Sequence, residues 1–201
     1  MLSNVPRATR AILVANIVVY LMQLSLGEGF TERFALWPLG ENFEPWQVFT
    51  YAFLHSPANP THIFFNMFAV FMFGSRLEHF LGTNRYVIYY VASLLAGACA
   101  QLAVAQATGA VYSVIGASGA VFGLLLAFAM FFPREKLMLL FPPIPMPAWL
   151  FVTLYGVLEL TLGVTGSQDQ VAHFAHLGGM LGGALVILIW RLQGTPRRPR
   201  F

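Results

Sequence analysis

A serine and two histidines stand near the starts of long apolar stretches in this chain. Ser118 lies in a Gly-Ala-Ser-Gly sequence at 116–119, and His173 and His176 begin a later apolar stretch. Hydroxyls and imidazoles are costly in hydrocarbon, so such groups are usually paired and functional there. A serine becomes a good nucleophile when a base lies within about 2.6–3.2 Å of its hydroxyl. These residues therefore predict a serine nucleophile and a histidine base inside a membrane.

The composition of the chain is that of a membrane domain. Hydrophobic residues make up 58% of the 201 residues and charged residues only 9%, whereas a soluble domain carries about 25% charged residues. No basic stripe with interleaved aromatic residues is present, so nucleic acid is not expected as a partner. A membrane span needs about 20 apolar residues, and the sequence predicts six. They lie near residues 11–27, 61–81, 86–107, 115–132, 148–165 and 171–191.

The segment 28–60, between the first two predicted spans, is too polar to cross a membrane. It carries four glutamates among several aromatic residues, a combination typical of a loop that lies at the interface between lipid and water. We therefore expect an all-α polytopic membrane protein, in which six transmembrane helices form a compact bundle and this interfacial loop joins the first two. The whole chain, 1–201, is expected to form this single domain.

The positions of lysine and arginine predict the orientation. In the six-span topology, ten of the eleven basic residues fall on one side, and only Arg33 falls on the other. Cytoplasmic loops carry the excess of basic residues, so both termini are expected in the cytoplasm. The arginine-rich stretch 197–200 would then lie beside anionic lipid headgroups. The predicted second, fourth and sixth spans all enter the membrane from the outer face.

Each of these three spans carries its polar residues at the outer end. His62 and Asn66 are four residues apart and His173 and His176 are three apart, so each pair lies on one helical face. At a rise of about 1.5 Å per residue, these side chains and that of Ser118 all lie within about 10 Å of their helix starts. The glycines within 178–183 favour close packing of the sixth span, which a serine–histidine contact requires. The shared depth predicts one polar site open to the outer face.

The sequence leaves several histidines open as the base. His55, His62, His173 and His176 all fall in the outer half of the predicted topology. Donors for a developing oxyanion would come from His62, Asn66 and the unpaired backbone N–H groups of the first helical turn at Ser118.

A carboxylate that orients the histidine would complete a triad, but the sequence offers no convincing one. Asp169 lies in an outer link and Glu78 at the inner end of the second span, while the facing of Glu159 in the fifth span is undecided. We therefore predict a Ser–His dyad.

Zinc is the main chemical alternative. His173 and His176, with His62 or His55, would supply three ligands, but metalloproteases normally place a glutamate beside such histidines. The chain has none at that place, so no metal and no cofactor is expected. A transporter or channel would need polar groups through both leaflets, and the stretches 123–132 and 181–190 carry almost none.

Three motifs in this order resemble the rhomboid intramembrane serine proteases. Along the chain they are His-Ile-Phe-Phe-Asn at 62–66, Gly-Ala-Ser-Gly at 116–119 and Ala-His-Leu-Gly-Gly at 175–179. The resemblance covers essentially the whole chain, at the size of the bacterial six-span core. It implies that the motif at 62–66 lines the oxyanion hole through its histidine and asparagine. The Arg and Glu at the inner end of the second span look structural.

The resemblance also implies individual roles in the site. Ser118 would be the nucleophile, and His176, directly before Leu-Gly-Gly, would be the general base. Phe122 matches an aromatic position that packs against the catalytic imidazole, and His173 matches a polar position at the mouth of the site. The family often carries Trp-Arg in its outer loop, where this chain has Gln47 after a tryptophan, so any contact made by that arginine is in doubt.

The implied activity is intramembrane proteolysis without a cofactor, in the inner membrane of a bacterium. The substrate would be a single-span membrane protein cut within or near its span, where a helix must unwind locally to expose its carbonyls. The alternative is a catalytically inactive relative that binds membrane clients. The loop 28–60 and the fifth span are both candidates for the substrate entrance, and the sequence leaves the oligomeric state open.

Overall fold

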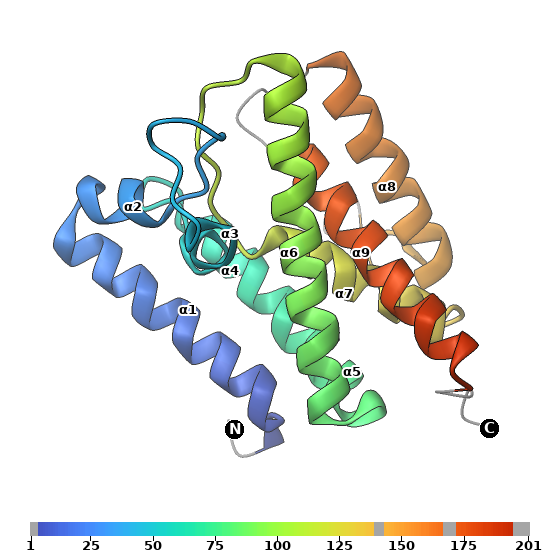
Figure 1. Ribbon diagram of the computed structural model, residues 1–201. Helices are drawn as coiled ribbons and strands as arrows, with labels where there is room; N and C mark the ends of the chain where they lie inside the picture. The colour runs from blue at the N-terminus through green and yellow to red at the C-terminus, as the bar shows by residue number, and fades with distance from the viewer. Residues whose placement is uncertain (1–3, 139–142, 167–171, 195–201) are drawn as a thin grey trace.

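The computed structural model describes residues 4–138, 143–166 and 172–194, and most of them are helical. Each of the six predicted spans falls on helical structure (Figure 1). In chain order the elements are α1 (Arg7–Leu26), α2 (Glu28–Phe34), α3 (Gln47–Thr50), the 3₁₀ turn η2 (Tyr51–Phe53), α4 (Pro60–Ala69), the π-helical turn η3 (Val70–Gly74), α5 (Ser75–Leu81), α6 (Thr83–Thr108), α7 (Ser118–Phe131), β1 (Lys136–Met138), β2 (Pro145–Pro147), α8 (Ala148–Thr165) and α9 (His173–Leu192).

Within the described residues, four helices, α1, α6, α8 and α9, are long and apolar enough to cross a membrane. They contain 18 to 26 residues, which corresponds to about 27–39 Å. The second predicted span consists of α4, η3 and α5, which follow one another without a break and together cover 60–81. The fourth corresponds to α7, whose 14 residues give a helix of only about 21 Å.

The chain ahead of α7 is extended rather than helical, so α7 begins later than the predicted 115. Leu36 and Val114 form an isolated antiparallel bridge, with two backbone hydrogen bonds of 3.0 Å. The N–H of Gly116 then donates to the carbonyl of Tyr51 at 2.9 Å. These bonds to the outer loop satisfy the backbone that a longer helix would have satisfied internally. The link from α6 descends into the bundle before α7 starts (Figure 1).

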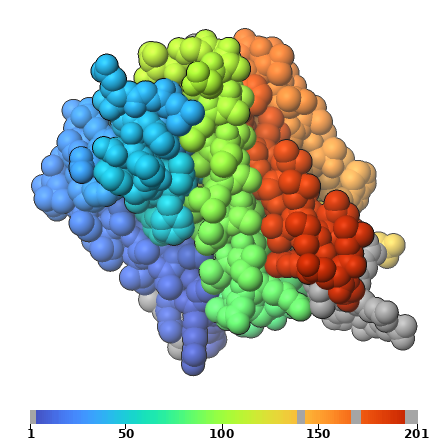
Figure 2. All heavy atoms as spheres, in the orientation of Figure 1, coloured from blue at the N-terminus to red at the C-terminus, as the bar shows by residue number. Residues whose placement is uncertain are grey.

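The centre of the bundle is α7, which packs against α6 and α9. Eleven of its 14 residues are buried. Glycines make the contact possible: a side chain at Gly179 of α9 would overlap the carbonyl of Gly119, and one at Gly178 would overlap Ala100 of α6. The predicted close packing of the glycine-rich span is thus present. On the face shown in Figure 2, α6 lies between the segment that holds α1 to α3 and α9.

The C-terminal end of the second predicted span is held by polar contacts, as expected. Glu78 Oε1 accepts from the Ala8 N–H at 3.0 Å, and Glu78 Oε2 accepts from the Thr9 N–H at 2.7 Å. These bonds satisfy free N–H groups of the first turn of α1. Arg76 forms a salt bridge of 2.7 Å with Glu135. The start of α1 and the end of α9 lie at this end of the molecule (Figure 1).

Two further features were not anticipated from the sequence. The all-α prediction misses a short antiparallel hairpin, in which β1 and β2 pair Lys136 with Pro147. Strands of three residues are too short to give a recognisable alternation of polar and apolar residues. In the outer loop, Gln47 is buried, accepts from the Trp37 N–H at 3.2 Å and donates to the Asn42 carbonyl at 3.0 Å. It therefore organises the loop from within.

Candidate active site

Ser118 is the first residue of α7. The N–H groups of the first turn of a helix have no partner within the helix and carry the positive end of the helix dipole, and in α7 no N-cap side chain accepts from them. Because α7 starts inside the bundle, these donors lie beside a half-buried hydroxyl rather than in bulk water. This position agrees with the prediction that Ser118 lies in the first turn of its helix.

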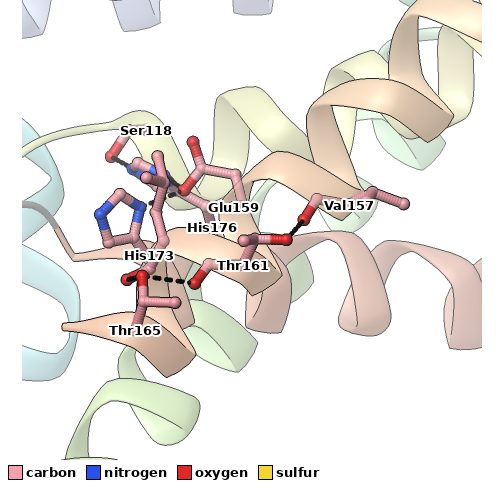
Figure 3. A network of polar contacts seen from close by, with 8 residues as sticks. Ser118, Val157, Glu159, Thr161, Thr165, His173 and His176 are labelled. Atoms are coloured by element: carbon pink, nitrogen blue, oxygen red, sulfur yellow. Dashed lines mark hydrogen bonds and ion pairs between the residues drawn. The ribbon is translucent and has the colours of Figure 1, made fainter. Parts of the chain in front are cut away.

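The hydroxyl of Ser118 contacts the imidazole of His176. The distance between Ser118 Oγ and His176 Nε2 is 2.8 Å, within the range that activates a serine. His176 lies one turn into α9, on the stretch that packs against α7 through Gly179 and Gly119. The close approach of the two backbones therefore brings the two side chains within hydrogen-bonding distance (Figure 3).

Phe122 fixes the plane of this imidazole. Its ring lies one helical turn after Ser118 and stacks on the ring of His176, with centroids 4.3 Å apart and planes 6° apart. Tyr155 of α8 contacts the phenyl ring of Phe122, with centroids 5.9 Å apart. Rotation of the imidazole away from Ser118 would break the stacking, so the packing favours the reactive orientation.

A carboxylate lies on the other side of the imidazole. Glu159 Oε2 is 2.8 Å from His176 Nδ1 and 2.7 Å from His173 Nδ1. The sequence offered no convincing carboxylate partner for the histidine, whereas the structure brings Glu159 into contact with both imidazoles. Figure 3 shows the side chains of Ser118, His176, Glu159 and His173 gathered in one place.

The sequence did hold a signal for Glu159. It lies six residues before the C-terminal end of α8, and hence about 9 Å from that end, at the depth shared by the other polar residues. Its facing was not predictable because only Ala148, Val152 and Glu159 of α8 are buried. So few buried positions give no periodic pattern that would mark the inner face of the helix.

His62 and Asn66 lie on α4, beside the segment that leads to Ser118. A side-chain atom added at Gly116 would lie 2.8 Å from His62 Nε2 and 3.7 Å from Ser118 Oγ. Gly116 has φ +126°, a conformation that favours glycine. The space left by the missing side chain thus lies between the imidazole of His62 and the hydroxyl of Ser118. Asn66 is buried and its amide donates to the carbonyl of His62 at 2.9 Å.

Of the four candidate histidines, His176 is the one whose ring nitrogen contacts the hydroxyl of Ser118. His55 is fully buried in the outer loop, where its ring lies 5.0 Å from the ring of His62. Burial lowers the pKa of His55 to about 3, and the neighbouring imidazole of His62 acts in the same direction. His55 therefore supports the site as a neutral packing residue.

The described residues contain one group with metal-ligand character, formed by Glu159, His173 and His176. Their ligand atoms lie within 4.8 Å of one another. These atoms are already joined by hydrogen bonds of 2.7 and 2.8 Å, with the carboxylate accepting from both imidazoles. The zinc set considered from the sequence, which included His62 or His55, is not the group that the structure forms.

The arrangement has the parts needed for acyl transfer: a serine, a base, and free backbone donors at a helix start. Over residues 42–193 the sequence matches the family model described as the Rhomboid domain. The chain belongs to the rhomboid family. It is thus a polytopic membrane protein with a mostly helical rhomboid domain. The matched region contains every residue of the candidate site.

Several curated proteins are similar to this rhomboid domain. Rhomboid protein 1, mitochondrial, of Saccharomyces cerevisiae is 33% identical over 126 aligned positions, which cover 62% of this chain and 36% of that protein. Rhomboid protease GluP of Bacillus subtilis is 24% identical over 172 positions, covering 83% of this chain and 31% of that protein. RHOMBOID-like protein 1 of Arabidopsis thaliana is 27% identical over 222 positions, covering 94% and 54%. The chain spans about a third to a half of these relatives.

Proposed function

We propose that this rhomboid domain is an intramembrane serine endopeptidase. The observation that carries the proposal is the 2.8 Å contact between Ser118 Oγ and His176 Nε2, made by a serine at a buried helix start and an imidazole stacked on Phe122. One of the similar proteins, GluP, is named a rhomboid protease, which supports the same chemistry.

The geometry supports a two-step acyl transfer. Ser118 Oγ attacks the scissile carbonyl carbon while His176 Nε2 takes the hydroxyl proton. The carbonyl oxygen becomes an oxyanion, for which the N–H groups of Ser118 and Gly119 and the side chains of His62 and Asn66 are the candidate donors. As the C–N bond breaks, His176 returns the proton to the leaving amine. Water then attacks the ester, with His176 again as the base, and releases the free serine.

The proposed substrate is a single-span membrane protein, cut within or near its span. A helical substrate hides its carbonyls in internal hydrogen bonds, so a segment with glycine, proline or polar residues is cheaper to unwind. We propose that the chain acts as one domain with six spans in the inner membrane of a bacterium. Both termini would lie in the cytoplasm and the site would open to the outer face. The positions of the basic residues support this orientation.

The test is cleavage of a fluorescent single-span substrate by the protein purified in detergent. The wild-type chain is expected to cleave it, while Ser118→Ala and His176→Ala are expected to lose activity by at least about 10³-fold. A chelator is expected to have no effect. Cleavage that survives in Ser118→Ala, or is lost with chelator alone, would contradict the assignment. Binding of membrane clients without cleavage by the wild type would favour the inactive, client-binding alternative.

A further inference from the structure

The carboxylate of Glu159 stands in line with the serine and the histidine. Ser118 Oγ contacts His176 Nε2 at 2.8 Å, and the opposite ring nitrogen of His176, Nδ1, contacts Glu159 Oε2 at 2.8 Å. Three different helices, α7, α9 and α8, supply the three residues. We propose that Glu159 is a positioning residue, which completes a Ser118–His176–Glu159 triad. This proposal rests on the proposed protease function.

The carboxylate selects one tautomer of His176. An ionised carboxylate only accepts hydrogen bonds, so the proton of the neutral imidazole must lie on Nδ1, toward Glu159. The unprotonated Nε2 then faces the hydroxyl of Ser118 and can take its proton. When His176 becomes an imidazolium during the attack, the same carboxylate oxygen stabilises the positive charge.

The burial of Glu159 makes a purely incidental contact unfavourable. Its side chain is 8% exposed and that of His176 is 10% exposed. A buried carboxylate costs several kcal/mol of solvation unless partners satisfy it. Two imidazoles of α9 form hydrogen bonds with Glu159 Oε2. Glu159 is also the only acidic or basic residue of α8, and the other side chains of this helix are apolar or uncharged.

His173 shares the carboxylate oxygen with His176. Its Nδ1 donates to Glu159 Oε2 at 2.7 Å, and its ring lies edge-on to the ring of His176, with centroids 6.3 Å apart. This second donor helps to hold the carboxylate in place. His62 of α4 is the further titratable group near His176. We therefore assign His173 a supporting role through Glu159.

A structural role would look different in one respect. The two hydrogen bonds of Glu159 also join α8 to α9, so its loss would lower stability even if it had no part in the reaction. A purely structural link between α8 and α9 would depend equally on both histidines, and its loss would disturb substrate binding together with turnover. A positioning role predicts a loss of kcat at nearly constant KM, and a much smaller effect of removing His173.

The experiment measures kcat, KM and thermal unfolding in detergent for three variants of the full chain. Glu159→Gln keeps the size of the side chain, but its uncharged amide can turn its NH₂ toward His176 and favour the wrong tautomer. We expect kcat to fall about 10²–10⁴-fold with KM within about threefold. Glu159→Asp keeps the charge and is expected to recover at least about tenfold over Glu159→Gln. His173→Phe is expected to lose less than about tenfold.

Glu78→Gln is the matched control, because it also removes a buried glutamate with hydrogen bonds to another helix. It is expected to lower the unfolding temperature and leave kcat per folded molecule unchanged. The triad is wrong if Glu159→Gln stays within threefold of wild type while Ser118→Ala is inactive, an outcome that leaves the protease function standing. It is also wrong if Glu159→Gln and His173→Phe lower kcat equally. No cleavage by the wild type would instead remove the protease function itself.

Discussion

The helices that carry the candidate site are held in two different ways. In α9, nine of the 20 residues are buried, among them four glycines that face α6 and α7. In α8, only three of the 18 residues are buried, and one of these is Glu159. The serine and the base therefore lie on a pair of helices in backbone contact, while the carboxylate lies on a helix with little packing.

This difference separates two ways of positioning a side chain. The contact between Ser118 and His176 follows from the distance between two backbones, which Gly119 and Gly179 set. The position of Glu159 follows from its own hydrogen bonds to two histidines. A rigid pair needs close packing and tolerates few changes, whereas a polar contact can be lost without disturbing the rest of the fold.

The largest effect is expected where the backbones touch. Gly179→Ala adds a methyl group that overlaps the carbonyl of Gly119, and a backbone group cannot move aside as a flexible side chain can. We expect a loss of at least about 3 kcal/mol of unfolding free energy and nearly complete loss of cleavage. Unfolding in detergent and the substrate assay measure the two effects.

Gly156→Ala on α8 is the matched control for this change. Its added methyl group would lie 3.4 Å from the flexible end of Met180, so we expect less than about 1 kcal/mol of destabilisation. Equal losses of unfolding free energy in the two alanine variants would show that α8 is packed as tightly as α9, and would contradict the proposed difference between the two helices.

The next effect concerns the aromatic ring under the imidazole. Phe122→Ala removes a buried ring that stacks on His176 at 4.3 Å. We expect a loss of about 3–5 kcal/mol of stability together with a fall in kcat, because the imidazole becomes free to turn. Phe151→Ala removes a half-buried ring stacked on Tyr155 of α8 and is expected to cost less than about 2 kcal/mol.

A smaller loss of stability is expected when the pH is lowered, because His55 in the outer loop is buried in its neutral form. The pKa of His55 is about 3 in the folded chain and about 6.5 when unfolded, so the unfolded state takes up a proton first as the pH falls. Stability is therefore retained above about pH 6.5 and lost between there and about pH 3, by about 2 kcal/mol at pH 5. Unfolding temperatures at pH 7 and pH 5 measure this loss. If His55→Gln loses as much stability between pH 7 and pH 5 as the wild type does, another group is responsible for the loss.

The smallest effect is expected on the lipid-facing surface of α8. Leu160 is 51% exposed, and Leu160→Ala removes apolar surface that already faces detergent or lipid. We expect a change in unfolding free energy below about 0.5 kcal/mol and unchanged cleavage. A large loss would mean that this surface packs against protein, such as a second copy of the chain.

Much of this molecule was predictable from the sequence because its signals are local. Apolar length predicted helices at all six places, and the equal depth of the polar residues predicted that Ser118 and a histidine would meet. The choice of His176 came from the resemblance, and the 2.8 Å contact agrees with it. The glycines of α9 predicted a close approach, and small residues fix that approach whatever the partner helix is.

Other features were decided by contacts between distant parts of the chain. The start of α7 depends on bonds that Val114 and Gly116 make to the outer loop, and the buried place of Gln47 depends on how that loop folds. The facing of Glu159, which the sequence left undecided, was decided in the same way. The rotation of α8 about its axis is set by neighbours rather than by its own nearly uniform apolar sequence.

The sequence by itself determined that this is a membrane domain of the rhomboid family, with a serine and histidines at one depth, because length, hydropathy and short motifs need no knowledge of neighbours. The tertiary structure alone decided which histidine nitrogen faces the serine, and that Glu159 turns inward to meet it. Helix rotation and side-chain contact at hydrogen-bonding distance depend on how the helices pack together, and an apolar sequence does not encode that rotation.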